Sequence, residues 1–335
     1  MKKGKGAVFL PLSRFLSTYY DIQVEEKIQF DEQEGYLQDN YLYFITSIPD
    51  KEIVYMEQAT IAYYLKENNY NHLSLPIPNI HGKWFTPLED KKYIVLKVEA
   101  YREDDGITDG QALASFHQIG AAYQYQPKEI SSYGNWRKLW IDKLTAFEMK
   151  IEEEVKKQPT DYYRLLMDVL PYLIGMSENA IQYARQSETD TRFHEADQGT
   201  FCFHRYHNQL KQPILWFDQL VYDHPARDIA EYIRTLLLNN EDDEEIVAFV
   251  RDYQSIHPLS VFSWRLVYSR LIFPSALFDF ISRGFMEAPV DYNLLHQELI
   301  GLLEKQTQYE RRLSNFYENL SIDTETLNIP VVNWL

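Results

Sequence analysis

Residues 200–234 read TFCFHRYHNQLKQPILWFDQLVYDHPARDIAEYIR. The middle of this stretch is a short apolar run with polar residues on both sides. The apolar run Pro213–Phe217 is typical of a buried strand. Asn208 precedes this run, and Asp218 follows it directly. A hairpin with an amide and a carboxylate at its two ends can hold a divalent cation and its phosphates, as in the kinase plan. We therefore expect Asn208 and Asp218 to face each other as candidate ligands of magnesium and of a magnesium–nucleotide complex, Mg-ATP.

The same stretch contains three motifs in a fixed order: a loop H-R-Y-H-N that starts at His204, a strand ending in W-F-D, and the helix start D-H-P-A-R-D-I-A at residues 223–230. They resemble the catalytic core of the aminoglycoside phosphotransferase and choline kinase-like superfamily. Its members carry H-x-D-x-x-x-x-N, then a strand ending in D, then D-x-P-x-x-D-L-A. Residues 113–117 read L-A-S-F-H, which is similar to the superfamily's L-A-x-F-H signature, and Gly120 follows where members have Gly. Within the superfamily, the chain resembles the CotS-like spore-coat proteins.

The resemblance implies an α+β, bilobal protein-kinase-like fold. Residues 1–100 would form a small β-rich N-lobe, and residues 101–335 a large, mainly helical C-lobe that carries the degenerate loop. It also implies a spore-coat location after synthesis in the cytoplasm of the sporulating cell, with other coat proteins as partners. His117 would support the loop from behind, Asp223 would brace the turn, and Asp228 would stand at the helix start. These three residues are expected to be structural rather than catalytic.

Three parts of the catalytic machinery are missing from the pattern. The loop from His204 to Asn208 is about three residues shorter than the superfamily pattern, so either Arg205 stands where the catalytic Asp is expected or that Asp is deleted. In both cases no carboxylate there can accept a hydroxyl proton. The strand before the first long helix reads YLYFITSI, and Ile45 or Thr46 occupies the position of the expected Lys. Gly35 stands alone, so no glycine-rich loop can cradle phosphates. The degenerate loop His204, Arg205 and Asn208 therefore predicts a catalytically inactive pseudokinase that acts in coat structure or assembly.

Two other functions remain open on the sequence. One is an active ATP-dependent phosphotransferase for a small molecule, of the aminoglycoside, choline or homoserine type, or for a protein, in which Lys92 or Lys97 replaces the missing Lys. The other is a pseudokinase that retains a nucleotide as a structural element. Binding of Mg-ATP would distinguish the second of these from a chain that has no nucleotide at all.

Several polar residues have a second, structural interpretation. Glu57 corresponds to the helix Glu that pairs with the kinase Lys, but a solvated carboxylate is the preferred interpretation because its partner is absent. Cys202 with His204 and His207 suggests a metal site, yet all three lie within six residues and have no second ligand pair. A buried Cys and loop histidines that bond to the backbone are therefore preferred.

The periodicity of apolar residues predicts the remaining elements. The expected strands are a hairpin over 33–48 and two strands over 80–86 and 93–98. The expected helices span 51–68, 110–117 with Asp109 as N-cap, a long segment after 137 that ends near 157, 162–185, 241–255, 259–283 and 289–319.

Composition restricts the class of protein. Hydrophobic residues make up 45% of the 335 residues, which indicates a folded chain, and the net charge of −17 disfavours nucleic acid and anionic membranes as partners. A single Cys excludes an internal disulfide framework. The basic N-terminus has too short an apolar part for a signal peptide, and no apolar run is long enough for a membrane span.

Overall fold

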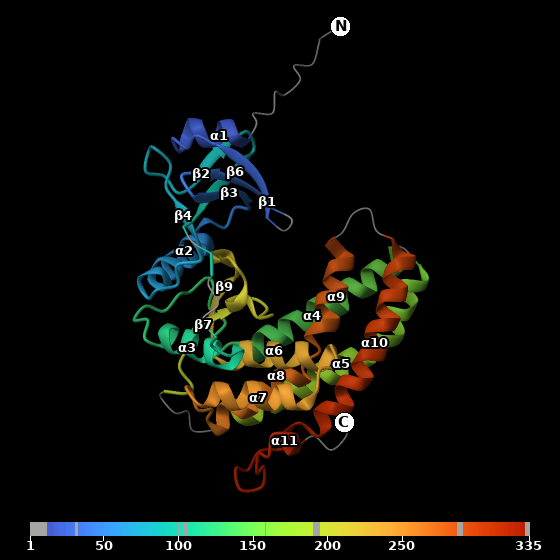
Figure 1. Cartoon of the computed structure of the whole chain (residues 1–335). Coiled ribbons are helices and arrows are strands. Elements are labelled where there is room, and N and C mark those ends of the chain that lie inside the picture. Colours follow the sequence, from blue (N-terminus) through green and yellow to red (C-terminus); the bar gives the residue numbers. More distant parts are fainter. Residues whose placement is uncertain are drawn as a thin grey trace. The chain divides into compact units, whose positions relative to one another are not determined.

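The computed structural model describes residues 12–30, 33–99, 101–102, 106–157, 159–189, 195–286 and 291–331. These residues form two compact units, which are described separately (Figure 1). Unit 1 contains the described residues up to Gly106 together with Pro127–Ile130 and Gln209–Leu220, and unit 2 contains the others. Each unit is therefore assembled from segments that are distant in the sequence. The division at residue 100 stays a prediction.

Unit 1 is built on one β-sheet. In hydrogen-bonding order its strands are β1 (Glu26–Phe30), β2 (Gln33–Gln38), β3 (Tyr41–Ile48), β6 (Lys91–Val98), β4 (Leu73–Ile77) and β8 (Leu215–Trp216), and β5 (Thr86–Leu88) also pairs with β6. Every pair is antiparallel except β4 with β8. The β2–β3 hairpin turns at Asp39 and Asn40, which both have positive φ, as a two-residue hairpin turn with the twist of the strands requires. The predicted hairpin over 33–48 is confirmed.

The two faces of this sheet carry different residues, because successive side chains of a strand point in opposite directions. On one face, Tyr36 and Tyr43 pack with Phe15 and Leu16 of helix α1 (Leu12–Tyr19). Phe44 points to the opposite face. Helix α2 (Glu52–Glu67) connects β3 to β4, within two residues of the prediction.

The strand predicted over residues 80–86 of unit 1 is wrong. Residues 80–85 form turns rather than a strand, because the Asn79 carboxamide oxygen accepts bonds from the backbone N–H groups of His81 and Lys83. The strand lies earlier, at β4, although Pro76 has no N–H to donate. Its pairing with β8 is limited to Leu73 and Ser74, so the proline lies beyond that ladder.

The apolar run Pro213–Phe217 contributes only the two-residue strand β8. A short 3₁₀ helix, η1 (Gln209–Lys211), precedes it, and η2 (Phe217–Gln219) follows it. Strand β7 (Thr200–Phe203) does not pair with β8 but with β9 (Leu220–Asp223). The expected hairpin with Asn208 and Asp218 at its two ends is therefore wrong. The run instead extends the N-terminal sheet through a parallel pairing.

Unit 2 is mainly helical. Its helices are α3 (Asp109–Ala121), α4 (Trp136–Lys157), α5 (Asp161–Ser187), α6 (Ala226–Leu238), α7 (Asp243–Gln254), α8 (Val261–Ile272), α9 (Ser275–Met286), α10 (Tyr292–Ser314) and α11 (Phe316–Asn319). Within the unit, α3 packs on α7, α4 on α5, and α8 on both α5 and α6 (Figure 1). Both α3 and α6 also contact β7, so the strand that leads into the loop packs on these two helices.

Several helix boundaries differ from the prediction, and two of these differences have a clear physical cause. The stretch 259–283 is two helices, α8 and α9, because Pro274 cannot continue a helix and the residue before it, Phe273, is extended. The N-cap of α3 is Thr108 rather than Asp109. Thr108 and Gln111 form a capping box, which leaves the Asp109 carboxylate available for other contacts.

Within the parts of the chain that the structure describes, no helix combines the length and the apolar character that a membrane span requires.

Candidate functional site

Arg205 lies in the loop after β7 and is held by an ion pair. Its Nε and Nη2 atoms donate to the two carboxylate oxygens of Asp279 in α9, at 2.6 and 2.9 Å. Its Nη1 donates to the carbonyl of His204, and the carboxylate of Glu231 lies 3.8 Å from Nε. Such a two-point arginine–carboxylate pair fixes the guanidinium firmly. The side chain at this position is thus a paired cation that cannot accept a proton.

Asn208 has both ends of its amide engaged within unit 2. Its Nδ2 donates to the carboxylate of Asp109 at 2.9 Å, and its Oδ1 accepts from the hydroxyl of Tyr206 at 3.3 Å. Tyr232 donates to the same Asp109 oxygen at 2.5 Å. The backbone of Asn208 has a φ of +66°, a conformation that Asn tolerates better than most residues. Asn208 therefore holds the end of the loop against the first turn of α3.

Asp218 belongs to unit 1 and lies in η2. Its carbonyl accepts a 2.7 Å bond from the Gln58 side chain of α2. Burial raises the pKa of the Asp218 carboxylate, and a bond from its own backbone N–H lowers it only in part. Within the described residues of unit 1, no other side chain forms a hydrogen bond or ion pair with this carboxylate. Because Asn208 belongs to unit 2, a cation shared by Asn208 and Asp218 stays a prediction.

The lysines that might replace the missing strand Lys are engaged elsewhere in unit 1. The Lys97 ammonium lies 3.6 Å from the centroid of the Tyr41 ring and 3.2 Å from a Glu99 oxygen. Lys92 pairs with Asp50 and Glu52. Both lysines therefore already have partners next to their own strand.

Glu57 is not a solvated carboxylate, so the preferred interpretation of this residue is wrong. Its two oxygens accept bonds from three consecutive backbone N–H groups, those of Lys128, Glu129 and Ile130, at 2.9, 2.9 and 3.1 Å. Backbone N–H groups that converge on a carboxylate form a small anion-binding nest. Glu57 thus ties the segment Pro127–Ile130 to α2.

Replacing Glu57 with Ala should destabilise unit 1 by about 1–3 kcal/mol, because three backbone N–H groups, one of them in the buried Ile130, lose a charged acceptor. The amides of Lys128, Glu129 and Ile130 should then exchange with solvent faster, which hydrogen exchange followed by mass spectrometry can measure. Glu67→Ala, at an exposed position of the same helix, is the matched control. Equal protection of residues 128–130 in both variants would contradict the role of Glu57.

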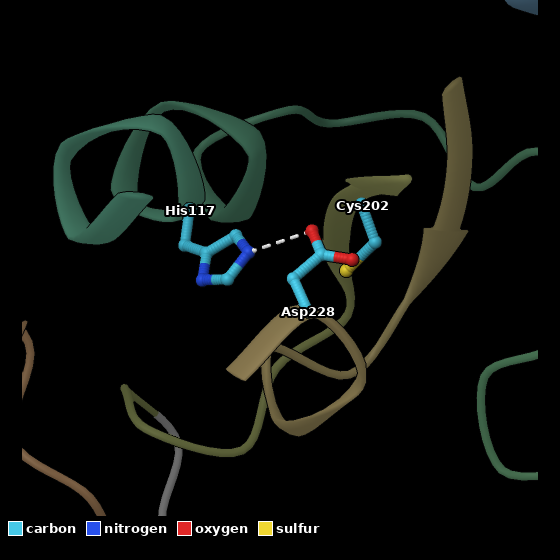
Figure 2. A group of neighbouring side chains, drawn as sticks. All are labelled: His117, Cys202 and Asp228. Carbon is cyan, nitrogen blue, oxygen red and sulfur yellow. Dashed lines mark hydrogen bonds and ion pairs between the residues drawn. The ribbon is translucent and has the colours of Figure 1, made fainter. Parts of the chain in front are cut away.

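His117, Cys202 and Asp228 form a buried cluster in unit 2 (Figure 2). The Nε2 of His117 lies 3.2 Å from an oxygen of Asp228, and its Nδ1 lies 2.8 Å from the hydroxyl of Tyr253. Both oxygens of Asp228 also accept from the backbone N–H of Phe203, at 3.0 and 3.2 Å. These bonds connect α3 and α6 to β7 from behind the loop.

One candidate ligand atom from each residue of this cluster lies within 4.8 Å of the others, which is compatible with a metal ion. The chemistry of the donors argues against one. Burial, and then the charges of Asp228 and Asp223, raise the pKa of the Cys202 thiol, whereas a metal needs the thiolate. His117 and Asp228 are already bonded to each other. The arrangement is that of a buried structural network.

The other metal candidate, Cys202 with His204 and His207, does not assemble in the described residues. Cys202 is buried, and its thiol lies 3.5 Å from the carbonyl of His224. His204 and His207 are exposed, and the Nδ1 of His207 lies 3.0 Å from the hydroxyl of Thr235.

Asp223 is the centre of a second buried network. Its side chain accepts from Trp136 Nε1 and Ser132 Oγ, and pairs with Arg227 and Arg270 at 3.0 and 2.8 Å. Burial alone would raise the pKa of Asp223, but the two guanidiniums and these hydrogen bonds hold it well below its usual range. The residue therefore stays ionised in the interior, where it joins β9 to α4, α6 and α8.

The sequence pattern did not indicate the contacts of two distant acidic residues with the loop. Asp279, the partner of Arg205, is separated from it by 74 positions, and Asp109, the partner of Asn208, by 99. Asp109 had a local signal, as an acidic residue at a helix start. Asp279 had no local signal, because no motif near it in the sequence indicates a contact with the loop.

Solved structures of phosphotransferases share this fold. An aminoglycoside phosphotransferase from Alicyclobacillus acidocaldarius superposes with a TM-score of 0.61 at 15% identity, covering 94% of this chain and 98% of the other. An amicoumacin kinase in complex with AMP-PNP and Ca²⁺ gives 0.56 at 13% identity, covering 94% and 96%. A spectinomycin phosphotransferase bound to AMP also gives 0.56 at 13%, covering 90% and 93%. The fold is thus kinase-like α+β, with a β-rich N-terminal part and a mainly helical C-terminal part, as expected.

The family is defined by sequence. The model of the family described as "Spore coat putative kinase YutH" matches residues 13–316. The endospore coat-associated protein YutH of Bacillus subtilis (strain 168) is 32% identical over 296 residues, which cover 85% of this chain and 84% of that protein. The chain belongs to the YutH family of spore-coat proteins. The predicted membership of a spore-coat family, and the coat as its location, are confirmed.

Proposed function

We propose that this protein acts in the structure or assembly of the endospore coat as a non-catalytic, kinase-like protein. The observation that carries the proposal is the ion pair of Arg205 with Asp279, at the position where a catalytic carboxylate is needed. An arginine without a bound partner would not fill this position with a fixed charge. Here the guanidinium is bound at two points by a helix of the same unit.

The phosphate-binding side of the site supports the same proposal. The pairing of β3 with β6 puts Thr46 on the face of Phe44 and Ile45 on the face of α1, so neither candidate position of the kinase Lys carries a cation. Glu57, the usual partner of that Lys, is satisfied by backbone N–H groups instead. Phosphoryl transfer depends almost entirely on positioning and charge stabilisation, so the loss of these groups removes most of the catalysis.

The residues present do not fit a magnesium–nucleotide complex. Asn208, the expected amide ligand, already uses its amide on Asp109 and Tyr206. Neither Ile45 nor Thr46, the candidate positions of the strand Lys, is a lysine that could contact the phosphates. Asp218 retains a carboxylate but has no partner ligand in Asn208.

The expected result with purified protein is no ATP-dependent phosphorylation of aminoglycosides, choline, homoserine or generic protein substrates above the level of Asp218→Asn. The missing loop carboxylate alone is typically worth about 10²–10⁴ in rate. In sporulating cells, a fluorescently tagged Asp218→Asn chain should reach the coat as the wild type does, because the carboxylate has no catalytic duty.

The carboxylate of Asp218, which pairs with no other side chain among the described residues of unit 1, favours the alternative of an active phosphotransferase with displaced groups. Phosphotransfer by the wild type that Asp218→Asn abolishes would establish that alternative. A second control is Arg205→Asp, which returns a carboxylate to the loop. It should remain inactive, because the strand Lys and the glycine-rich loop are still missing.

A further inference from the structure

The face of the unit 1 sheet that carries Phe44 is covered by aromatic rings from separate segments. Phe30 ends β1, Phe44 lies in β3, Trp216 lies in β8, and Tyr101 follows β6. The strand register places Phe30, Phe44 and Trp216 on the same face, because their partners across the ladders alternate in step. The sheet thus gathers rings that are far apart in the sequence.

These rings pack on one another. Phe44 and Trp216 meet edge to face with centroids 4.9 Å apart and an interplanar angle of 79°. Phe30 lies 6.3 Å from Phe44 and 6.5 Å from Trp216, again edge to face. This is the preferred geometry of aromatic pairs in a core. Phe44 is 1% exposed and Trp216 9% exposed, and the ring of Tyr101 stacks on the outer side of Phe30.

The backbone beneath the rings leaves no room. A Cβ atom added to Gly35 of β2 would lie 2.9 Å from the Phe44 ring and 3.1 Å from Ile28. The ring of Phe44 therefore lies directly against the backbone of β2. Gly35 is needed here for packing, and not for a loop that binds phosphate.

This face is the one that a nucleotide would use. In the kinase plan, the turn between the first two strands covers the phosphates, and a Lys of the third strand contacts them. The nucleotide must then lie beneath that turn, on the face to which the third-strand residue points. Of the two candidate residues, Ile45 packs on the face that α1 covers, whereas Thr46 shares its face with Phe44. The nucleotide would therefore lie on the face of Thr46 and Phe44.

We propose that Phe30, Phe44 and Trp216 form an internal aromatic plug that fills the space a purine ring would need against this sheet, so that the chain does not take up ATP or ADP there. The inference rests on the proposed non-catalytic function and deepens it. It separates a protein that has lost only the chemistry from one that has also replaced the ligand with its own side chains.

The plug predicts opposite responses in two kinds of experiment. Mg-ATP, Mg-ADP and adenosine at millimolar concentration should shift the melting temperature of the wild type by less than about 1 °C, because only binding to the native state stabilises it. Trp216→Ala should open an apolar cavity that binds indole, as cavities left by large side chains can bind aromatic molecules. Indole should raise the melting temperature of that variant by about 2 °C or more and leave the wild type unchanged.

Phe15→Ala is the matched control, since it removes a buried ring from the opposite face of the same sheet. A bicyclic indole does not fit the space of one phenyl ring, so this variant should not respond. Where Trp216→Ala fails to fold, the wild type labelled with 5-fluorotryptophan replaces it. Its Trp216 fluorine resonance, assigned with Trp216→Phe, should not move when Mg-ATP is added.

Three results would overturn the plug: nucleotide binding by the wild type that Trp216→Ala weakens, a folded Trp216→Ala without response to indole, or a Trp216 resonance that shifts with Mg-ATP. The first would make the rings a platform for a base. Nucleotide binding without phosphotransfer would refute the plug and leave the proposed function intact, whereas phosphotransfer would refute both.

Discussion

Asp223→Asn is expected to lower the free energy of unfolding by about 3–5 kcal/mol at pH 7, the usual cost of removing one partner from a buried ion pair. The carboxylate is fully buried and lies 2.8 Å from Nη2 of Arg270. Arg270 is itself buried, so its guanidinium would remain in the interior without a full counter-charge. Denaturant unfolding followed by far-ultraviolet circular dichroism measures the loss.

The same substitution should have a defined pH dependence. Asp223 has a lowered pKa in the folded state, because the guanidiniums of Arg270 and Arg227 and its hydrogen bonds outweigh the effect of burial. An acid of this kind contributes its full stability above its unfolded pKa of about 4, and loses it as the pH falls through the lower folded pKa. The difference between wild type and variant should therefore be constant near neutral pH and shrink below about pH 4.

Asp161→Asn is the control for Asp223→Asn. Asp161 pairs with Arg164 at 3.1 Å, but both side chains are more than 70% exposed. An exposed pair of this kind contributes at most about 0.5 kcal/mol. If the two variants lost the same stability, the buried network around Asp223 would not have the role assigned to it.

Gly120→Ala should lower the free energy of unfolding by about 3 kcal/mol, the upper end of the usual range for overpacking. Gly120 is a helical residue of α3, and β7 crosses it closely. A Cβ atom there would clash with the hydroxyl of Thr200 and lie 2.5 Å from the backbone nitrogen of Phe201. That hydroxyl donates to the carbonyl of His117, so the clash would also disturb the network behind the loop.

Gly175→Ala gives the matched comparison, since Gly175 is a helical residue of α5 with nothing within 4 Å of an added Cβ. There the change should stabilise the protein by about 0.5–1 kcal/mol, the gain in helix propensity. Thermal unfolding of both variants measures the contrast. A Gly120→Ala protein as stable as Gly175→Ala would mean that β7 does not approach α3 as closely as described.

Local sequence patterns predicted the parts of the fold that depend on neighbouring residues. Helix α2 was expected over 51–68 and spans Glu52–Glu67, because its apolar residues recur at helical spacing. The β2–β3 hairpin was expected for a similar reason. The motif L-A-S-F-H indicated a buried His117, and this residue is fully buried between α3, β7 and α6.

Breaks and caps were predicted less well. The boundary at Pro274 was missed, although the proline is a local signal, because apolar periodicity continues on both sides of it. Asp109 was expected as N-cap, whereas Thr108 one residue earlier forms the cap. Both are polar residues suited to a cap, so the sequence alone could not select between them.

Membership of a spore-coat family and the kinase-like fold class were determined by the sequence alone, because each depends on which residues stand at motif positions. Tertiary structure decided which distant residues contact one another around the loop and the sheet. Asp279 reaches Arg205, Lys128–Ile130 reach Glu57, and Trp216 reaches Phe44 only after distant segments pack together. Side-chain periodicity reports which face of an element is buried, but not which distant residue lies opposite, since that is set by the packing of whole elements.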